Sequence, residues 1–145
     1  MICAVHALIG AALGKSLKSR KQALLAGAIS HFFADLLPHR DLSVKTEAAL
    51  ALTALAAIGA AEGWNSTAFW GAVGGVAPDL ENAFSQTFHR TRNFFPSHTG
   101  LHGARVKEFT PQLVIALICW AVLLGRGAAP QAPTVEVESL AEARC

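Results

Sequence analysis

Apolar residues gather in five segments along the 145-residue chain, and short polar stretches separate these segments. They cover residues 2–14, 22–38, 47–62, 67–77 and 111–125. None shows the alternation of apolar and polar positions that marks a half-buried strand. Alanine and leucine, which favour helix, are abundant across them. The pattern therefore predicts an all-α protein, a compact bundle of about five helices.

The composition of the chain indicates a membrane protein. Of the residues, 52% are hydrophobic and 15% are charged, whereas an ordinary soluble domain carries about 25% charged residues. No segment reaches the roughly 18 uninterrupted apolar residues of an unambiguous membrane span. The best candidates are residues 48–64 and 111–125. We expect a bundle that is integral to a membrane or associated with one.

The orientation of such a bundle stays open. The densest basic cluster, Lys15–Lys21, should face the cytoplasm by the positive-inside rule. If all five segments crossed, a connector with four basic residues would lie outside, against the same rule: Arg90, Arg92, Arg105 and Lys107. Segments 2–14 and 67–77 could remove this conflict by not crossing.

Length and charge bound the organisation of the chain. We expect one domain over residues 1–126 and a flexible tail over 127–145, where the composition becomes rich in proline and alanine. The net charge of +2 is scattered over connectors, which argues against nucleic acid as a partner. The sequence does not indicate an oligomeric state.

Small and sulfur-containing residues add two expectations. Glycines four apart, such as Gly10 with Gly14 and Gly71 with Gly75, would let helices approach closely, although glycine is also simply frequent here. Gly59 and Gly63 form a third such pair. The three cysteines lack any metal-site or disulfide spacing, so we expect Cys3 and Cys119 to act as small apolar residues.

Candidate chemistry begins with His31 and Asp35 in the second segment. Residues four apart on a helix lie on one face, so a metal ion could bridge the two side chains. The alternative is a buried hydrogen bond that only locks helices together. Pro38 should end the helix and bring His39 and Asp41 near the mouth of the site.

Two further segments offer metal ligands. Asp79 follows Pro78 at the end of a glycine-rich helix and could face the site, or could simply cap the next short helix. His6 lies in the middle of the first apolar segment. A lone histidine in an apolar helix is more often a core residue whose hydrogen bonds are made within the protein. His6 becomes a better candidate ligand because three other regions of the chain also supply side chains that bind metals.

The segment 88–103 holds three of the six histidines. His98 and His102 are four apart and could share a metal ion, although Gly100 disfavours a regular helix between them. Near His89, Arg90 could clamp a phosphate group. A solvated or lipid-bound arginine is the alternative, which we favour for Arg92.

Other chemistries fit less well. The chain has no nucleophile-elbow serine, phosphate-binding glycine loop or HExxH zinc motif. A mixed histidine and aspartate set suits zinc, and manganese or iron are alternatives.

These motifs resemble those of the small bacterial inner-membrane proteins described as metal-dependent hydrolases, and more distantly those of the helical prokaryotic zinc-dependent phospholipases C. The resemblance rests on His6, on "SHFFADLLPH", on "GGVAPDLE" and on "FHRTRNFFPSH". It implies a helical bundle in the bacterial inner membrane with a bound divalent metal. The implied ligands are His6, His31, Asp35, Asp79 and one or more of His89, His98 and His102. The chain departs from the usual pattern at Glu81 and Asn82, and His89 and His98 are nine residues apart.

We therefore predict a membrane-bound metal-dependent hydrolase, plausibly a phosphoesterase that acts on lipid or on a small molecule reached at the membrane. One late histidine, His89, His98 or His102, would complete the metal shell or act as general acid, and Arg90 would stabilise phosphate charge. The main alternative is a non-catalytic membrane protein with a structural metal or a buried histidine and aspartate network. A metal or proton transporter is a third reading, which the short segments disfavour.

Overall fold

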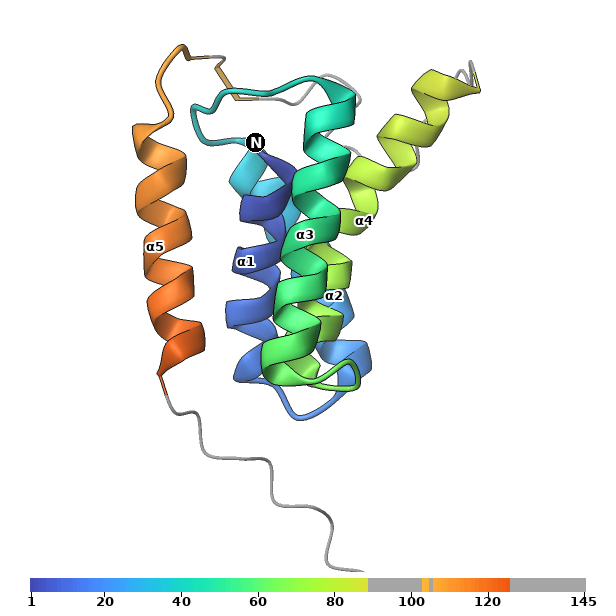
Figure 1. Ribbon diagram of the computed structural model, residues 1–145, viewed down its shortest axis with the longest axis vertical. Helices are drawn as coiled ribbons and strands as arrows, with labels where there is room; N and C mark the ends of the chain where they lie inside the picture. Colours follow the sequence, from blue (N-terminus) through green and yellow to red (C-terminus); the bar gives the residue numbers. More distant parts are fainter. Residues whose placement is uncertain (89–102, 105, 126–145) are drawn as a thin grey trace, which may run out of the picture.

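The computed structural model describes residues 1–88, 103–104 and 106–125. This part of the chain contains five helices and no strand, so the predicted all-α bundle is confirmed (Figure 1). The helices are α1 (Cys3–Lys15), α2 (Arg20–Asp35), α3 (Val44–Glu62), α4 (Thr67–Thr87) and α5 (Thr110–Leu124). Successive helices run up and down, which places the start of α1, α3 and α5 at one end of the bundle together with the end of α2.

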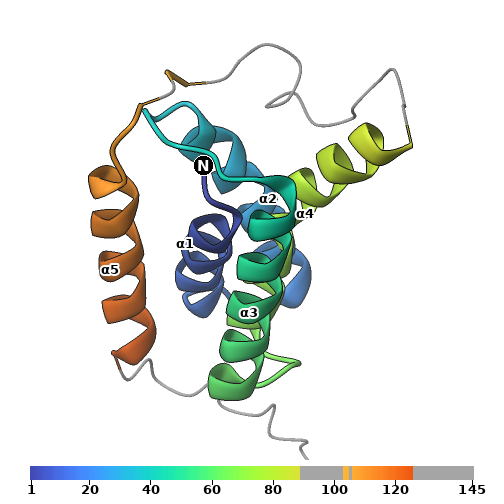
Figure 2. The ribbon, with the colours of Figure 1, turned by 45° about the horizontal axis from the view of Figure 1, so that its top comes forward.

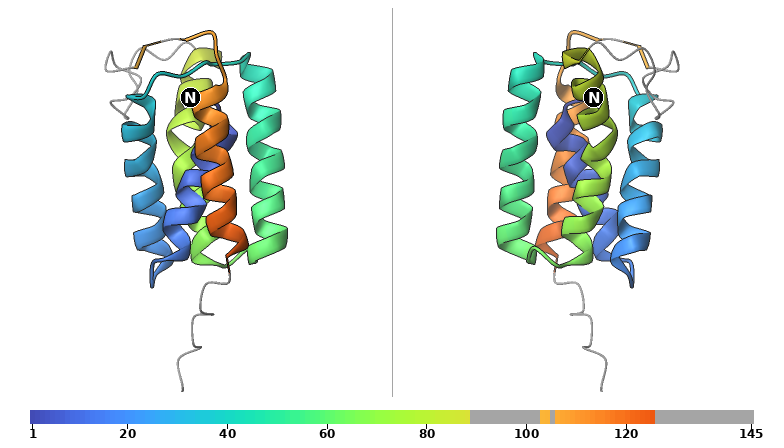
Figure 3. Two further views of the ribbon diagram at one scale, coloured as in Figure 1. Left: turned by 90° about the vertical axis from the view of Figure 1, so that its left-hand side faces the viewer. Right: turned by 90° about the vertical axis from the view of Figure 1, so that its right-hand side faces the viewer.

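Helix α1 packs against each of the other four helices, and α4 also packs against α2 and α3. Figure 3 shows α2 and α3 on opposite sides of the central pair formed by α1 and α4. Helix α5 lies along α1 at the edge of the bundle. Side chains of α1 and α4 are therefore the ones best placed to meet those of α2 inside the bundle.

Close backbone contact between α1, α2 and α4 depends on glycine. A methyl group added at Gly10 or at Gly71 would meet the carbonyl oxygen of the other residue, and one added at Gly75 would meet the carbonyl of His6. The expected close approach is thus confirmed for the pairs in α1 and α4. The third pair acts differently, because Gly59 faces the indole of Trp64 and Gly63 ends α3 with a φ of 93°.

Small side chains fill the interior, and large apolar side chains face outwards. The buried apolar residues include seven alanines, among them Ala7, Ala11 and Ala72, which have no exposed surface. In α5, by contrast, Leu117 is 68% exposed and Leu124 is 70% exposed. One described helix, α3, is long and apolar enough to cross a membrane, and only 17% of its most apolar window is buried.

Helix α4 differs from the sequence expectation. The pattern predicts a helix that stops at residue 77, whereas α4 continues through Pro78 to Thr87. Proline inside a helix removes one backbone hydrogen bond and favours a bend, and Figure 1 shows the C-terminal part of α4 leaning away from the other helices. Asp79 lies inside this helix, so its interpretation as the cap of a separate short helix is wrong.

Candidate metal centre

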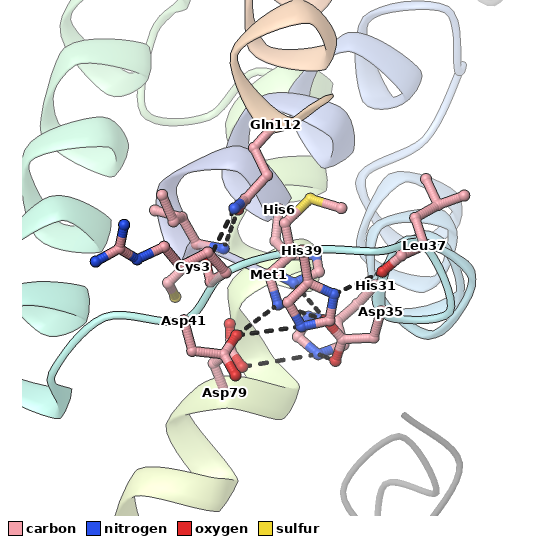
Figure 4. A network of polar contacts seen from close by, with 12 residues as sticks. Met1, Cys3, His6, His31, Asp35, Leu37, His39, Asp41, Asp79 and Gln112 are labelled. Atoms are coloured by element: carbon pink, nitrogen blue, oxygen red, sulfur yellow. Dashed lines mark hydrogen bonds and ion pairs between the residues drawn. The ribbon is translucent and has the colours of Figure 1, made fainter. Parts of the chain in front are cut away.

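Four of the predicted ligands meet at the end of the bundle where α2 ends. His6 comes from α1, His31 and Asp35 come from α2, and Asp79 comes from α4 (Figure 4; Figure 2 brings this end forward). His6, His31 and Asp79 each offer a ligand atom, and these three atoms lie within 4.8 Å of one another. The structure therefore gathers on one spot side chains that are up to 73 residues apart, from 6 to 79.

Asp35 is the centre of the polar contacts. Its Oδ1 atom accepts a hydrogen bond from Nε2 of His6 at 3.0 Å, and its Oδ2 atom lies 3.1 Å from Nε2 of His31. The amino nitrogen of Met1 is 2.9 Å from Oδ1. Asp35 is only 1% exposed, so these partners replace the water that a carboxylate would otherwise need.

The second nitrogen of His31 fixes the state of its ring. Nδ1 lies 2.8 Å from the carbonyl oxygen of Gly75. Because a carbonyl can only accept, Nδ1 carries the proton of this bond. Nε2 then faces the two carboxylates, 3.1 Å from Asp35 and 3.8 Å from Oδ1 of Asp79. An unprotonated nitrogen between two carboxylates needs a cation, which can be a proton or a metal ion.

Helix α4 supplies two groups to this arrangement from one face. The carbonyl of Gly75 and the side chain of Asp79 are four residues apart, which is one turn of helix. The same spacing relates His31 and Asp35 in α2. Asp79 is 22% exposed at its side chain, whereas the imidazole of His31 is fully buried. The site is therefore closed by protein on the side of His31 and reaches solvent on the side of Asp79.

His6 completes the buried part of the site. Its ring stacks on that of His31, with centroids 3.9 Å apart and an angle of 25° between the planes. Among the described residues, its Nδ1 atom has no hydrogen-bond partner, although His6 is only 1% exposed. A nitrogen lone pair is thus available inside the site, beyond the hydrogen bond that Nε2 makes with Asp35.

His39 and Asp41 form a smaller cluster beside Asp35. Nδ1 of His39 donates to the carbonyl oxygen of Leu37 at 2.7 Å, and Nε2 lies 3.1 Å from Oδ1 of Asp41. That oxygen is also 3.3 Å from the amino nitrogen of Met1. Burial lowers the pKa of His39 below its ordinary value of 6.5. Burial thus opposes a charge on His39, whereas the neighbouring Asp41 carboxylate favours one.

Two residues without a predicted role, Gln112 and Glu47, hold this end of the bundle together. Gln112 at the start of α5 accepts from the backbone of Ile2 and donates to the carbonyl of Arg40. Glu47 accepts from the backbone of Cys3. Gln112 could have been noticed in the sequence as a lone amide beside an apolar run, but its partners could not, because they lie far away along the chain.

The predicted roles of His89, Arg90, His98 and His102 concern residues outside the described part of the chain, as do Arg92 and the tail over 127–145. These roles stay predictions. In the described part, the arrangement can bind a cation, donate protons from imidazole and orient a carboxylate. Comparison with protein-family models, with curated proteins and with solved structures found no match to this chain.

Proposed function

We propose that the protein is a membrane-bound, metal-dependent hydrolase whose divalent ion is held by His6, His31, Asp35 and Asp79. Zinc is the ion that we expect, because a mixed set of imidazole and carboxylate ligands suits it, and manganese or iron would also fit. A phosphoester of a lipid, or of a small molecule at the membrane, is the proposed substrate.

The observation that carries this proposal is the environment of Nε2 of His31. Its partner nitrogen donates to a backbone carbonyl, as metal-binding histidines commonly do with their second nitrogen. Two ligand atoms that are each about 2.1 Å from a tetrahedral zinc ion lie about 3.4 Å apart. The separations of 3.1 Å and 3.8 Å from this nitrogen to Asp35 and Asp79 bracket that value.

The outer surface supports the membrane part of the proposal. Large apolar side chains stand exposed on α5 and on the outer faces of α2 and α3, including Phe33 at 62% and Leu52 at 68%. Extensive exposed apolar surface is typical of a face that contacts a membrane or a partner. At 1.5 Å per residue, the 19 residues of α3 span about 28 Å, close to the roughly 30 Å of a bilayer core.

The ion would activate a water molecule and polarise the ester bond that breaks. The protein's own residues would supply the rest. Asp35 keeps the His6 and His31 rings in place, and Gly75 holds Nδ1 of His31 protonated. Asp79 lies on the side open to solvent, which is where a substrate would approach.

The alternative is a non-catalytic protein in which the same residues form a structural network. It is favoured by the fact that Asp35 already engages His6, His31 and the amino group of Met1 without any ion. In that case a proton on Nε2 of His31 would take the place of the metal.

Hydrolysis assays on the full chain in detergent or lipid would test the proposal. The purified protein would be loaded with zinc, manganese or iron and offered a phosphomonoester, a phosphodiester and a lipid ester. We expect hydrolysis of one of these substrates. The rate should fall by more than about 100-fold in Asp79→Asn, because loss of a group that only orients a ligand typically costs 10–100-fold. Asp41→Asn would be the matched control. A folded, metal-loaded protein that hydrolyses none of them would contradict the proposal.

A further inference from the structure

The last residue of α2 is held by a glycine that lies far away along the chain. Gly103 donates from its backbone N–H group to the carbonyl oxygen of Asp35 at 2.7 Å. Asp35 is also the residue whose carboxylate meets His6 and His31 in the proposed metal centre. The position of its backbone therefore limits where its carboxylate can lie.

The sequence that follows α2 explains why the carbonyl of Asp35 takes an outside partner. In an uninterrupted helix, this carbonyl would accept from the N–H group four residues later, which belongs to His39. Pro38 has no N–H group and disfavours a helical conformation at the residue before it, and α2 ends at Asp35. The N–H group of His39 donates instead to the carbonyl of Ala104 at 3.2 Å. Gly103 thus takes the place that His39 would fill in a longer helix.

Position 103 requires glycine because the backbone at the end of α2 comes very close to it. A methyl group added there would lie within 2.8 Å of three successive carbonyl oxygens, those of Asp35, Leu36 and Leu37. These oxygens belong to the backbone, so they cannot turn aside as the end of a flexible side chain can. A side chain at this position would push the two segments apart and weaken the hydrogen bond to Asp35.

The carboxylate of Asp35 has little freedom to adjust to such a shift. Its Oδ1 atom lies 3.0 Å from Nε2 of His6, and its Oδ2 atom lies 3.1 Å from Nε2 of His31. The two oxygens are thus directed to rings on two different helices. A binding site of this kind works when its members are held within about 0.5 Å of their proper positions, so the backbone of Asp35 has to be fixed as well.

We propose that Gly103 is a positioning residue for the metal centre, whose backbone N–H group fixes the end of α2 and thereby the Asp35 carboxylate. This inference rests on the proposed metal site. Gly103 acts through Asp35 without touching the ion, and loss of a partner of this kind typically costs 10–100-fold in metal affinity.

The first test is the zinc affinity of the full chain in detergent, measured by competition with a chromophoric chelator. We expect Gly103→Ala to bind zinc about 10–100-fold more weakly than wild type. Gly14→Ala is the matched control, because its methyl group would also meet a backbone carbonyl, that of Thr67, at the opposite end of the bundle. Its zinc affinity should stay within about threefold of wild type, since distant sites act nearly independently.

Hydrogen exchange in the wild type tests the inference without any substitution. Coupling between two sites is reciprocal, so zinc must strengthen the contact of Gly103 by the same factor by which that contact strengthens zinc binding. We expect exchange at the N–H group of Gly103 to slow by about 10–100-fold when zinc is added. The N–H group of Gly125, which donates to the carbonyl of Ala121 at the end of α5, is the control and should exchange at an unchanged rate.

Zinc binding without any change in exchange at Gly103 would overturn the inference while leaving the metal site intact. Equal losses of affinity in Gly103→Ala and Gly14→Ala would overturn it too, because general destabilisation would then explain both. A folded wild type that binds no zinc would overturn the proposed function and this inference together.

Discussion

His31 donates a hydrogen bond from Nδ1 to the carbonyl oxygen of Gly75 across 2.8 Å. This bond decides which nitrogen faces the carboxylates of Asp35 and Asp79, because it uses the only proton of a neutral imidazole. The bond exists because α2 and α4 lie backbone to backbone, and an added methyl group at Gly27 would meet the carbonyl of Gly71. The close packing of α2 on α4 therefore sets the orientation of the His31 ring in the site.

Replacement of Asp35 by asparagine should destabilise the metal-free protein strongly. Asp35→Asn keeps the volume but removes the charge that faces His6, His31 and the amino group of Met1. Breaking a buried pair from one side typically costs about 3–5 kcal/mol. Unfolding monitored by circular dichroism in detergent would measure the loss. Asp41→Asn, at a side chain that is 32% exposed, should cost much less, and equal losses in the two variants would contradict the central place of Asp35.

Glycine at the crossing of α1 and α4 should tolerate no side chain. Gly71→Ala would push a methyl group into the carbonyl of Gly10, and overpacking of this kind costs about 1–3 kcal/mol. Gly59→Ala is the matched control, because its methyl group meets the indole of Trp64, a side chain that is 58% exposed, and not a backbone carbonyl. Thermal unfolding of both variants checks the difference. Equal melting temperatures would argue against the observed crossing.

The amide of Gln112 should hold α5 to the site end of the bundle. Gln112→Leu keeps the size of the side chain but leaves the N–H group of Ile2 and the carbonyl of Arg40 without this partner. Each lost partner of a buried polar group costs about 1–3 kcal/mol. Hydrogen exchange should become faster at the N–H group of Ile2, which donates to Gln112 in the wild type. Leu113→Ala, on the exposed face of α5, should leave this exchange unchanged, and an unchanged rate in Gln112→Leu would refute the role of the amide.

Acid should weaken the fold through His39. Burial lowers its pKa in the folded protein, so the unfolded chain takes up a proton first as the pH falls. The free energy of unfolding should therefore decrease as the pH drops below the ordinary value of 6.5. Stability curves of wild type and His39→Gln, compared between about pH 8 and pH 5, isolate this contribution. A wild type that gains stability on acidification relative to the variant would show that His39 is charged instead.

The sequence predicts the helices and most of the described ligand set because both depend on local spacing. Apolar segments give the five helices, and the spacing of four places His31 and Asp35 on one face. The course of α4 could not be predicted, since a proline usually ends a helix, whereas here α4 continues through the buried Pro78 to Thr87.

Contacts between distant segments also escaped prediction. Cys3 meets Glu47, and Gln112 meets Ile2 and Arg40, only because the helices pair in one particular way. Nothing in the local sequence fixes that pairing. The glycines at positions 10, 71 and 75 are consistent with close packing of α1 on α4. Glycine is common throughout this chain, however, so the spacing alone does not identify which helices cross.

The metal content of the purified full chain shows whether His6, His31, Asp35 and Asp79 hold an ion. Elemental mass spectrometry would be applied to detergent-purified wild type, Asp35→Asn and Asp79→Asn after zinc loading and removal of free ions, with folding checked by circular dichroism. We expect about one zinc ion per wild-type chain and a loss of that ion in both folded variants. A folded wild type without metal would contradict the proposed metal site and would leave His6, His31 and Asp35 as a hydrogen-bonded structural network.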